Sequence, residues 1–141
     1  MLDSIFDGMA EQIVSAFGDG VMICREEAWQ GVKTPCFFLL LEESRLKPML
    51  GGRKYAAHSF EVRYLPAAED KNLEMDHAAG ELSRALSLIP CDGGWIRGTD
   101  IRWERDGDEL RFHVTYGFFF REEETKDMME LCDKIEVTLY H

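Results

Sequence analysis

The sequence predicts an α+β fold, consisting of a mostly antiparallel sheet with two helices packed on one face and a long β-hairpin. The hairpin is predicted by Ile96–Phe120, in which two runs rich in β-branched and aromatic residues flank Asp106-Gly107, a dipeptide typical of tight turns. The helices are predicted by apolar residues at helical spacing, from Leu2 to Phe17 and from Met75 to Ile89. Isolated helices among several strands favour a layer of helices on one side of a sheet.

Shorter patterns predict the remaining elements. Gly18 and Gly20 end the first helix, and Pro90 ends the second. The predicted strands, in chain order, are Val21–Arg25, the doubly apolar Cys36–Leu41, the alternating Tyr55–Tyr64, and a last candidate at Ile135–Tyr140. The stretch Glu42–Gly52 is expected to be a connection, and alternation along the third strand places Glu61 on its solvent-facing side.

The hairpin register follows from its turn. If Asp106-Gly107 forms the turn, one apolar face consists of Leu110, Phe112, Val114, Tyr116, Phe118 and Phe120. On the outer face, this register sets Arg102 opposite Arg111 and Glu104 opposite Glu109. Like charges directly opposed on neighbouring strands are unfavourable, and diagonal pairing or the charges of a partner would relieve them. We therefore interpret the outer face of the hairpin as a candidate contact surface.

The bulk properties of the chain limit the classes of function. A length of 141 residues suits one domain, spanning residues 1–141. The net charge of −11 argues against sequence-specific binding of nucleic acid, which needs clustered Lys and Arg. No apolar run approaches the roughly 20 residues that cross a bilayer, and the acidic amino terminus lacks the features of a secretion signal, so we expect an intracellular protein without membrane contact. The expected free thiols are Cys24, Cys36, Cys91 and Cys132.

The sequence shows no chemistry at motif level, so we predict no catalytic, cofactor-binding or metal-binding residue. His58 and His113 lie in predicted strands and His77 in the second helix, with no motif that places a nucleophile or carboxylate beside them. The run Phe118–Phe120 puts aromatic rings on both faces of a strand end. Either the carboxy-terminal tail or a neighbouring subunit would cover the second face.

Ordered segments over residues 1–120 resemble the small tail terminator proteins of phages and prophages of Gram-positive bacteria. These segments are Met1–Ile5, Gln30–Phe38, Leu50–Tyr55, Phe60–Pro66, Arg97–Arg102 and Phe112–Phe120. The resemblance implies a structural virion protein that is not an enzyme and needs no cofactor. It implies a small α+β subunit that closes into a homo-oligomeric ring, commonly a hexamer. The ring would cap the tail tube, end its polymerisation and join the tail to the head connector. Such a protein would occupy the bacterial host cytoplasm during assembly and then the virion tail.

A ring subunit needs two different patches that meet head to tail. We predict contacts between subunits or with the tail tube at Trp29, Phe38, Arg53, Arg102, Arg111 and Phe119. The sequence leaves three alternatives open. They are another head–tail joining or tail-completion protein, a small ligand- or host-factor-binding module with a deep pocket, and a hydrolase or metal enzyme in which two histidines and a carboxylate converge.

Overall fold

The computed structural model describes residues 2–25, 33–67, 69–121 and 139–140, and it has the predicted α+β class. Its elements are, in chain order, α1 (Leu2–Phe17), β1 (Met22–Cys24), β2 (Cys36–Pro48), the 3-10 turn η1 (Leu50–Gly52), β3 (Arg53–Leu65), α2 (Lys71–Ala85), β4 (Leu88–Cys91), β5 (Gly94–Asp106), β6 (Glu109–Arg121) and β7 (Leu139–Tyr140). The strands form one sheet in the order β1-β2-β3-β6-β5-β4, with β7 paired to β6. Every strand pair is antiparallel except β1 with β2.

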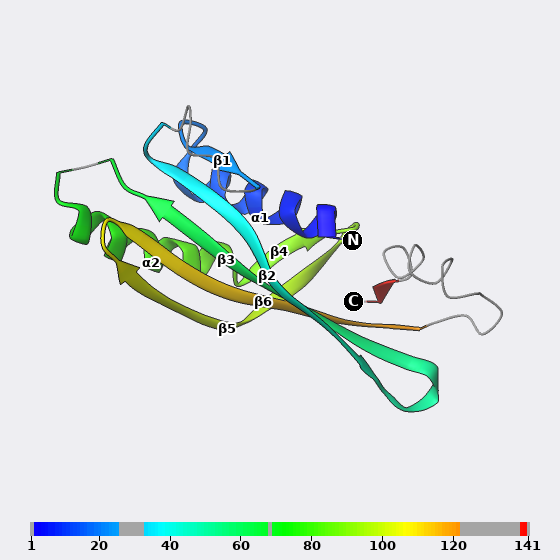
Figure 1. Ribbon diagram of the computed structural model, residues 1–141. Helices are drawn as coiled ribbons and strands as arrows, with labels where there is room; N and C mark the ends of the chain where they lie inside the picture. The colour runs from blue at the N-terminus through cyan, green and yellow to red at the C-terminus, as the bar shows by residue number, and fades with distance from the viewer. Residues whose placement is uncertain (1, 26–32, 68, 122–138, 141) are drawn as a thin grey trace.

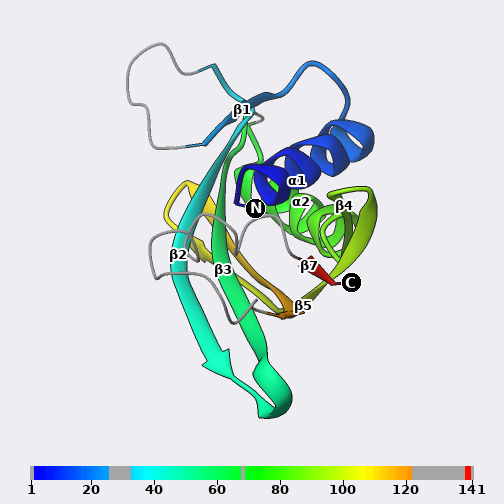
Figure 2. The ribbon, with the colours of Figure 1, turned by 90° about the vertical axis from the view of Figure 1, so that its right-hand side faces the viewer.

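Both helices cover the same face of the sheet, as predicted (Figures 1 and 2). The apolar stripe of α1 buries Ile5, Met9 and Ile13 completely, and α2 buries Met75 and Leu82. These side chains join the apolar faces of β2, β3 and β6 in one continuous hydrophobic cluster. The apolar face predicted for the second hairpin strand is confirmed, because all of its residues are buried in that cluster. Burial of this area supplies most of the driving force for folding.

The long hairpin is present, but its predicted turn and register are wrong. Asp106 pairs with Glu109, so the loop is Gly107-Asp108, and positive φ occurs at Gly107 alone. That pattern fits a type II′ turn, not the type I′ turn predicted. Glu104 therefore faces Arg111, and Arg102 faces His113, so the predicted opposition of like charges does not occur. The pairing of Glu104 with Arg111 instead sets opposite charges across the strands, an arrangement that favours the hairpin.

The second helix is shorter than its apolar spacing suggests. It ends at Ala85, and the predicted final residues enter β4, which pairs with β5 through a two-residue loop at Asp92-Gly93. Both loop residues have positive φ, 48° and 81°, so the type I′ Asp-Gly turn occurs here. Pro90 is tolerated in β4 because this strand lies at the edge of the sheet. The amino end of α2 is capped by Asp70, whose side chain accepts a hydrogen bond from the Leu73 amide at 3.2 Å.

Glu42–Gly52 is not the connection that the sequence predicted. β2 continues through it to Pro48 and pairs with β3 along its whole length, with one irregularity between Leu41 and Glu43. The paired ends of these strands project beyond the helices as a ribbon (Figures 1 and 2). We call residues 41–55 the arm. Its β2 residues are all exposed, and Leu50 at its tip is 94% exposed. Without a buried face, the arm shows no hydrophobic periodicity, and for that reason its strands were not predictable from pattern.

Three cysteines of the described residues confirm the predicted free thiols. Cys24, Cys36 and Cys91 are unbridged, whereas Cys132 lies outside the described residues. Burial raises the pKa of Cys36 and Cys91, which makes both thiols less reactive. Of the predicted last strand, Leu139–Tyr140 is described, and it pairs with β6. In the described part of the chain, neither helix has the length and hydropathy needed to span a membrane.

Candidate assembly surface

The sheet face turned away from the helices, here called the outer face, carries the candidate site. Side chains alternate along each strand, so residues next to core positions of β3 and β6 point to this face. Glu61 lies beside the core residue Phe60, and His113 beside Phe112. Glu61 is only 7% exposed and His113 8% exposed, which corrects the prediction that the Glu61 side of β3 faces solvent. The outer face therefore combines a polar cluster with an aromatic end near the arm.

At the end of β6, the outer face carries an aromatic contact between neighbouring strands. The ring of Phe119 lies 4.8 Å from the ring of Tyr55 on β3, centroid to centroid, and remains 38% exposed. The guanidinium of Arg53 lies 5.0 Å from the centroid of the Phe119 ring, within the range of a cation–π contact. Tyr55 crosses Gly117, where a Cβ would fall 1.9 Å from the tyrosine oxygen. The missing side chain of Gly117 is thus what lets Tyr55 cross this position and contact Phe119.

Basic side chains surround these rings. Arg45 and Lys47, both on β2, line a hollow of about 190 Å³ together with Tyr55 and Ala57. A second hollow, of about 370 Å³, is lined by Arg53, Phe119, Phe120 and Arg121. We call Arg45, Lys47, Arg53, Tyr55 and Phe119 the basic–aromatic patch. Aromatic and arginine side chains of this kind are enriched in protein interfaces.

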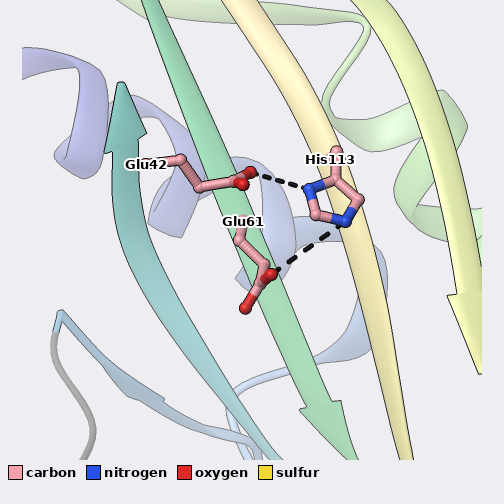
Figure 3. Close-up of side chains that lie close together, drawn as sticks. All are labelled: Glu42, Glu61 and His113. Atoms are coloured by element: carbon pink, nitrogen blue, oxygen red, sulfur yellow. Dashed lines mark hydrogen bonds and ion pairs between the residues drawn. The ribbon is translucent and has the colours of Figure 1, made fainter. Parts of the chain in front are cut away.

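The polar cluster consists of Glu42, Glu61 and His113. It lies farther along the outer face and joins three strands (Figure 3). His113 of β6 forms a hydrogen bond through Nδ1 with Glu42 of β2 at 2.7 Å. Its Nε2 lies 4.0 Å from a carboxylate oxygen of Glu61 on β3 and 4.0 Å from one of Glu104 on β5. Beside this cluster, the hydroxyls of Ser59 and Thr115 are 2.9 Å apart. The imidazole therefore links β2 to β6 and is surrounded by carboxylates.

Burial is the main electrostatic effect in the cluster. It raises the pKa of Glu61, and the neighbouring carboxylate of Glu42 raises it further, whereas His113 and Arg111 act in the opposite direction. Glu61 also forms an ion pair with Arg63. Donor atoms of Glu42, Glu61 and His113 all lie within 4.8 Å of one another, and carboxylate and imidazole are groups that can hold a divalent cation. Each of these donors already has a partner in the chain, so the arrangement serves first to hold the strands together.

The histidine-enzyme alternative required two histidines and a carboxylate in one pocket. Only His113, of the three histidines that the structure describes, reaches the polar cluster. His58 instead contacts the Ser44 hydroxyl through Nδ1 at 2.7 Å, and His77 lies on α2. The cluster also forms part of the wall of a hollow of about 180 Å³ that Arg102 lines. The convergence that this alternative needed is absent from the described residues.

The structure brings together only some of the predicted contact residues. Arg53 and Phe119 meet in the basic–aromatic patch. Arg102 and Arg111 lie near the polar cluster, where Arg111 forms ion pairs with Asp106 at 3.0 Å and with Glu109 at 3.1 Å. Phe38 is on the outer face but is only 4% exposed in the subunit, and Trp29 lies outside the described residues. Contact with other subunits stays a prediction for all six.

Sequence patterns missed the polar cluster and the basic residues of the arm. Glu42, Glu61 and His113 are far apart in the chain and meet only because β3 lies between β2 and β6. Arg45 and Lys47 stood in a stretch that was expected to be a connection. A signal for the arm was present, since residues 44–54 contain four basic residues and no acidic one in a chain of net charge −11.

Comparison with known proteins gives one informative match. A family model described as phage tail terminator protein matches residues 4–128. No curated protein matches the chain. Among solved structures, 27 chains match. One of them, described without an organism or an activity, covers 89% of this chain and 99% of its own length, with 12% sequence identity and a TM-score of 0.39.

Proposed function

This chain belongs to the phage tail terminator protein family, and from that membership we propose that its copies close into a ring, such as a hexamer, that caps the tail tube. The ring ends polymerisation of the tube and presents a surface to the head connector. The observation that carries this proposal is the family match over residues 4–128.

The family is a family of structural phage-tail proteins and not a class of enzyme. Membership implies association with other components of the phage tail and supports a location in the virion tail. We extend this to a course of events in which the subunit is made and assembled in the cytoplasm of the bacterial host. We also propose that residues 1–141 act as one domain, supported by the continuous core that both helices share with the sheet.

Two properties of the subunit support a ring around a DNA passage. The chain exposes different surfaces at different ends, with the projecting arm at one end and the two helices over the other part of the sheet (Figure 1). Different patches in head-to-tail contact produce rings when the rotation closes. The net charge of −11 suits a passage that repels DNA phosphates.

The direct test polymerises the purified tail-tube protein of the same phage with and without this chain. Negative-stain images should show tubes of uncontrolled length without it, and shorter tubes with a ring at one end when it is added. Tubes of equal length in both mixtures, without end rings, would overturn the proposal. If the tubes keep their length but become able to attach to heads, the chain is a head–tail joining protein instead.

A further inference from the structure

Charge is segregated along this chain. Residues 44–54 of the arm contain Arg45, Lys47, Arg53 and Lys54 and no acidic residue, whereas the whole chain has a net charge of −11. The distal part of the arm is therefore a basic projection on a strongly acidic protein. Glu43 at the base of the arm lies 3.5 Å from Arg45, and both side chains are exposed, so this pair can exchange for an acidic partner. Its apolar tip residue Leu50 and the rings of Tyr55 and Phe119 add apolar area beside these charges. Such a surface is complementary to an acidic surface that also offers apolar contact.

The acidic counterpart lies on α1. Asp3, Asp7 and Glu11 follow one another at intervals of four residues, so they share one face of the helix, and all three are exposed. The helix contains no Lys or Arg. Asp3 is paired with Arg25 at 2.7 Å, whereas Asp7 and Glu11 form no ion pair within the described ranges of the chain. We call these three residues the acidic stripe.

The two surfaces match in spacing as well as in charge. Arg45 and Lys47 are two positions apart on a strand, which separates them by about 6.6 Å. Asp7 and Glu11 are four positions apart on a helix, which separates them by about 6 Å along its axis. Two ion pairs can thus form at once, while the exposed Val14 one turn farther along α1 is in a position to approach the aromatic part of the patch.

We propose that the basic–aromatic patch on the arm of one subunit binds the acidic stripe on α1 of a second copy of this chain. Within one subunit the arm extends beyond the helical layer and away from α1, so the two surfaces do not meet (Figures 1 and 2). The contact joins two different patches and therefore propagates from subunit to subunit. It rests on the proposed ring and names the surfaces that close it.

The test uses charge reversal on the full chain, measured by sedimentation velocity at low ionic strength, where exposed charges are least screened. The arm variant is Arg45→Glu with Lys47→Glu, and the stripe variant is Asp7→Lys with Glu11→Lys. Each should weaken self-association by at least about tenfold, because like charges then face each other. The chain carrying all four substitutions should associate again. Arg97→Glu, at an exposed position of β5, is the control for a change of charge alone and should leave association unchanged.

Circular dichroism of every variant establishes that the fold is retained. Recovery of association in the fourfold variant supports the contact, because only restored complementarity explains it. If the wild-type chain associates and neither reversal weakens it, the contact is wrong while the ring stands. A wild-type chain that stays monomeric, both alone and on tail tubes, overturns the contact and the ring together. If the arm variant loses binding to tail tubes or to duplex DNA but associates normally, the arm's partner is that molecule and not a second copy.

Discussion

Two helical glycines provide a sharp test of how α1 is held on the sheet. A Cβ added at Gly8 of α1 would lie 2.0 Å from the carbonyl oxygen of Pro90 on β4, whereas a Cβ at Gly80 of α2 would meet nothing within 4 Å. Replacing a helical glycine with alanine stabilises a helix by about 0.8–1.0 kcal/mol. Gly80→Ala should gain that amount, which raises Tm by roughly 2–4 °C for a chain of this size.

Gly8→Ala should have the opposite sign. Relief of the clash requires α1 and β4 to separate by roughly 1.4 Å in a close-packed interior. Overpacking typically costs about 1–3 kcal/mol, and here the obstacle is backbone. The separation also strains the hydrogen bonds of Ser4 with the Asp92 amide, at 3.0 Å, and of Gln12 with the Leu88 carbonyl, at 3.2 Å. We therefore take the upper end of that range, about 3 kcal/mol, and after the gain of about 0.8–1.0 kcal/mol in helix propensity we expect a net loss of about 2 kcal/mol.

Urea denaturation of the wild type and the two variants, followed by circular dichroism, measures both values. The slope of the transition should stay the same, so that the midpoints compare directly. If Gly8→Ala raises the midpoint as much as Gly80→Ala does, the close approach of α1 to β4 is wrong. An unchanged midpoint in Gly80→Ala would instead refute the value assigned to helix propensity.

Three further predictions concern the outer face and the core. Phe119→Asp should abolish self-association, measured by light scattering, while the monomer stays folded. The control Leu73→Asp also replaces an exposed apolar side chain and should leave self-association unchanged. Equal association of both variants would show that Phe119 is not in the interface. Burial raises the pKa of Glu61 in the folded chain above its ordinary value of 4.5. The protonated carboxyl therefore favours the folded state, and this stabilisation is complete below about pH 4.5 and is lost as pH rises through the folded-state pKa. Glu61→Gln should remove this decline from urea midpoints measured between about pH 4 and 8, and an identical pH slope in both proteins would contradict it. Tyr116→Phe should lower the free energy of unfolding by about 1–2 kcal/mol, because the buried tyrosine hydroxyl donates to the Leu86 carbonyl at 2.7 Å; an unchanged urea midpoint would show that this bond adds nothing.

Local periodicity predicted the parts of this fold that have one buried face. Helix α1 and the apolar face of β6 lie where their patterns place them, because burial of alternate or every third to fourth residue leaves a record in the sequence. The choice of turn was less predictable. Two of the chain's four Asp-Gly pairs lie between antiparallel strands. The type I′ turn forms at Asp92-Gly93, whereas the loop beside Asp106 is Gly107-Asp108. Which residues close each loop depends on where the strand ladders end, and this is not a local property.

The candidate site was predictable only in part, for a related reason. Phe119 was predicted from an aromatic run, and Arg53 lies in one of the segments that carry the family resemblance; pairing of β3 with β6 brings them together. The polar cluster depends on a buried imidazole that contacts strands remote in sequence, so no residue spacing in the chain predicts it. Arg45 and Lys47 were hidden because both faces of their strand are exposed.

The position of β6 has a consequence for the order of folding. β6 pairs with β3 from Leu110, opposite Tyr64, to Arg121, opposite Arg53. Between these two strands in the sequence stand α2, β4 and β5. The hairpins β2–β3 and β5–β6 each close over short loops and can form early and independently. Pairing of β3 with β6 then requires closure of the long segment between them. We expect this step to be slow, because contacts between residues far apart in the sequence form slowly. Until it occurs, β3 and β6 each present an unpaired edge, so newly made chains are exposed to misassociation during this interval.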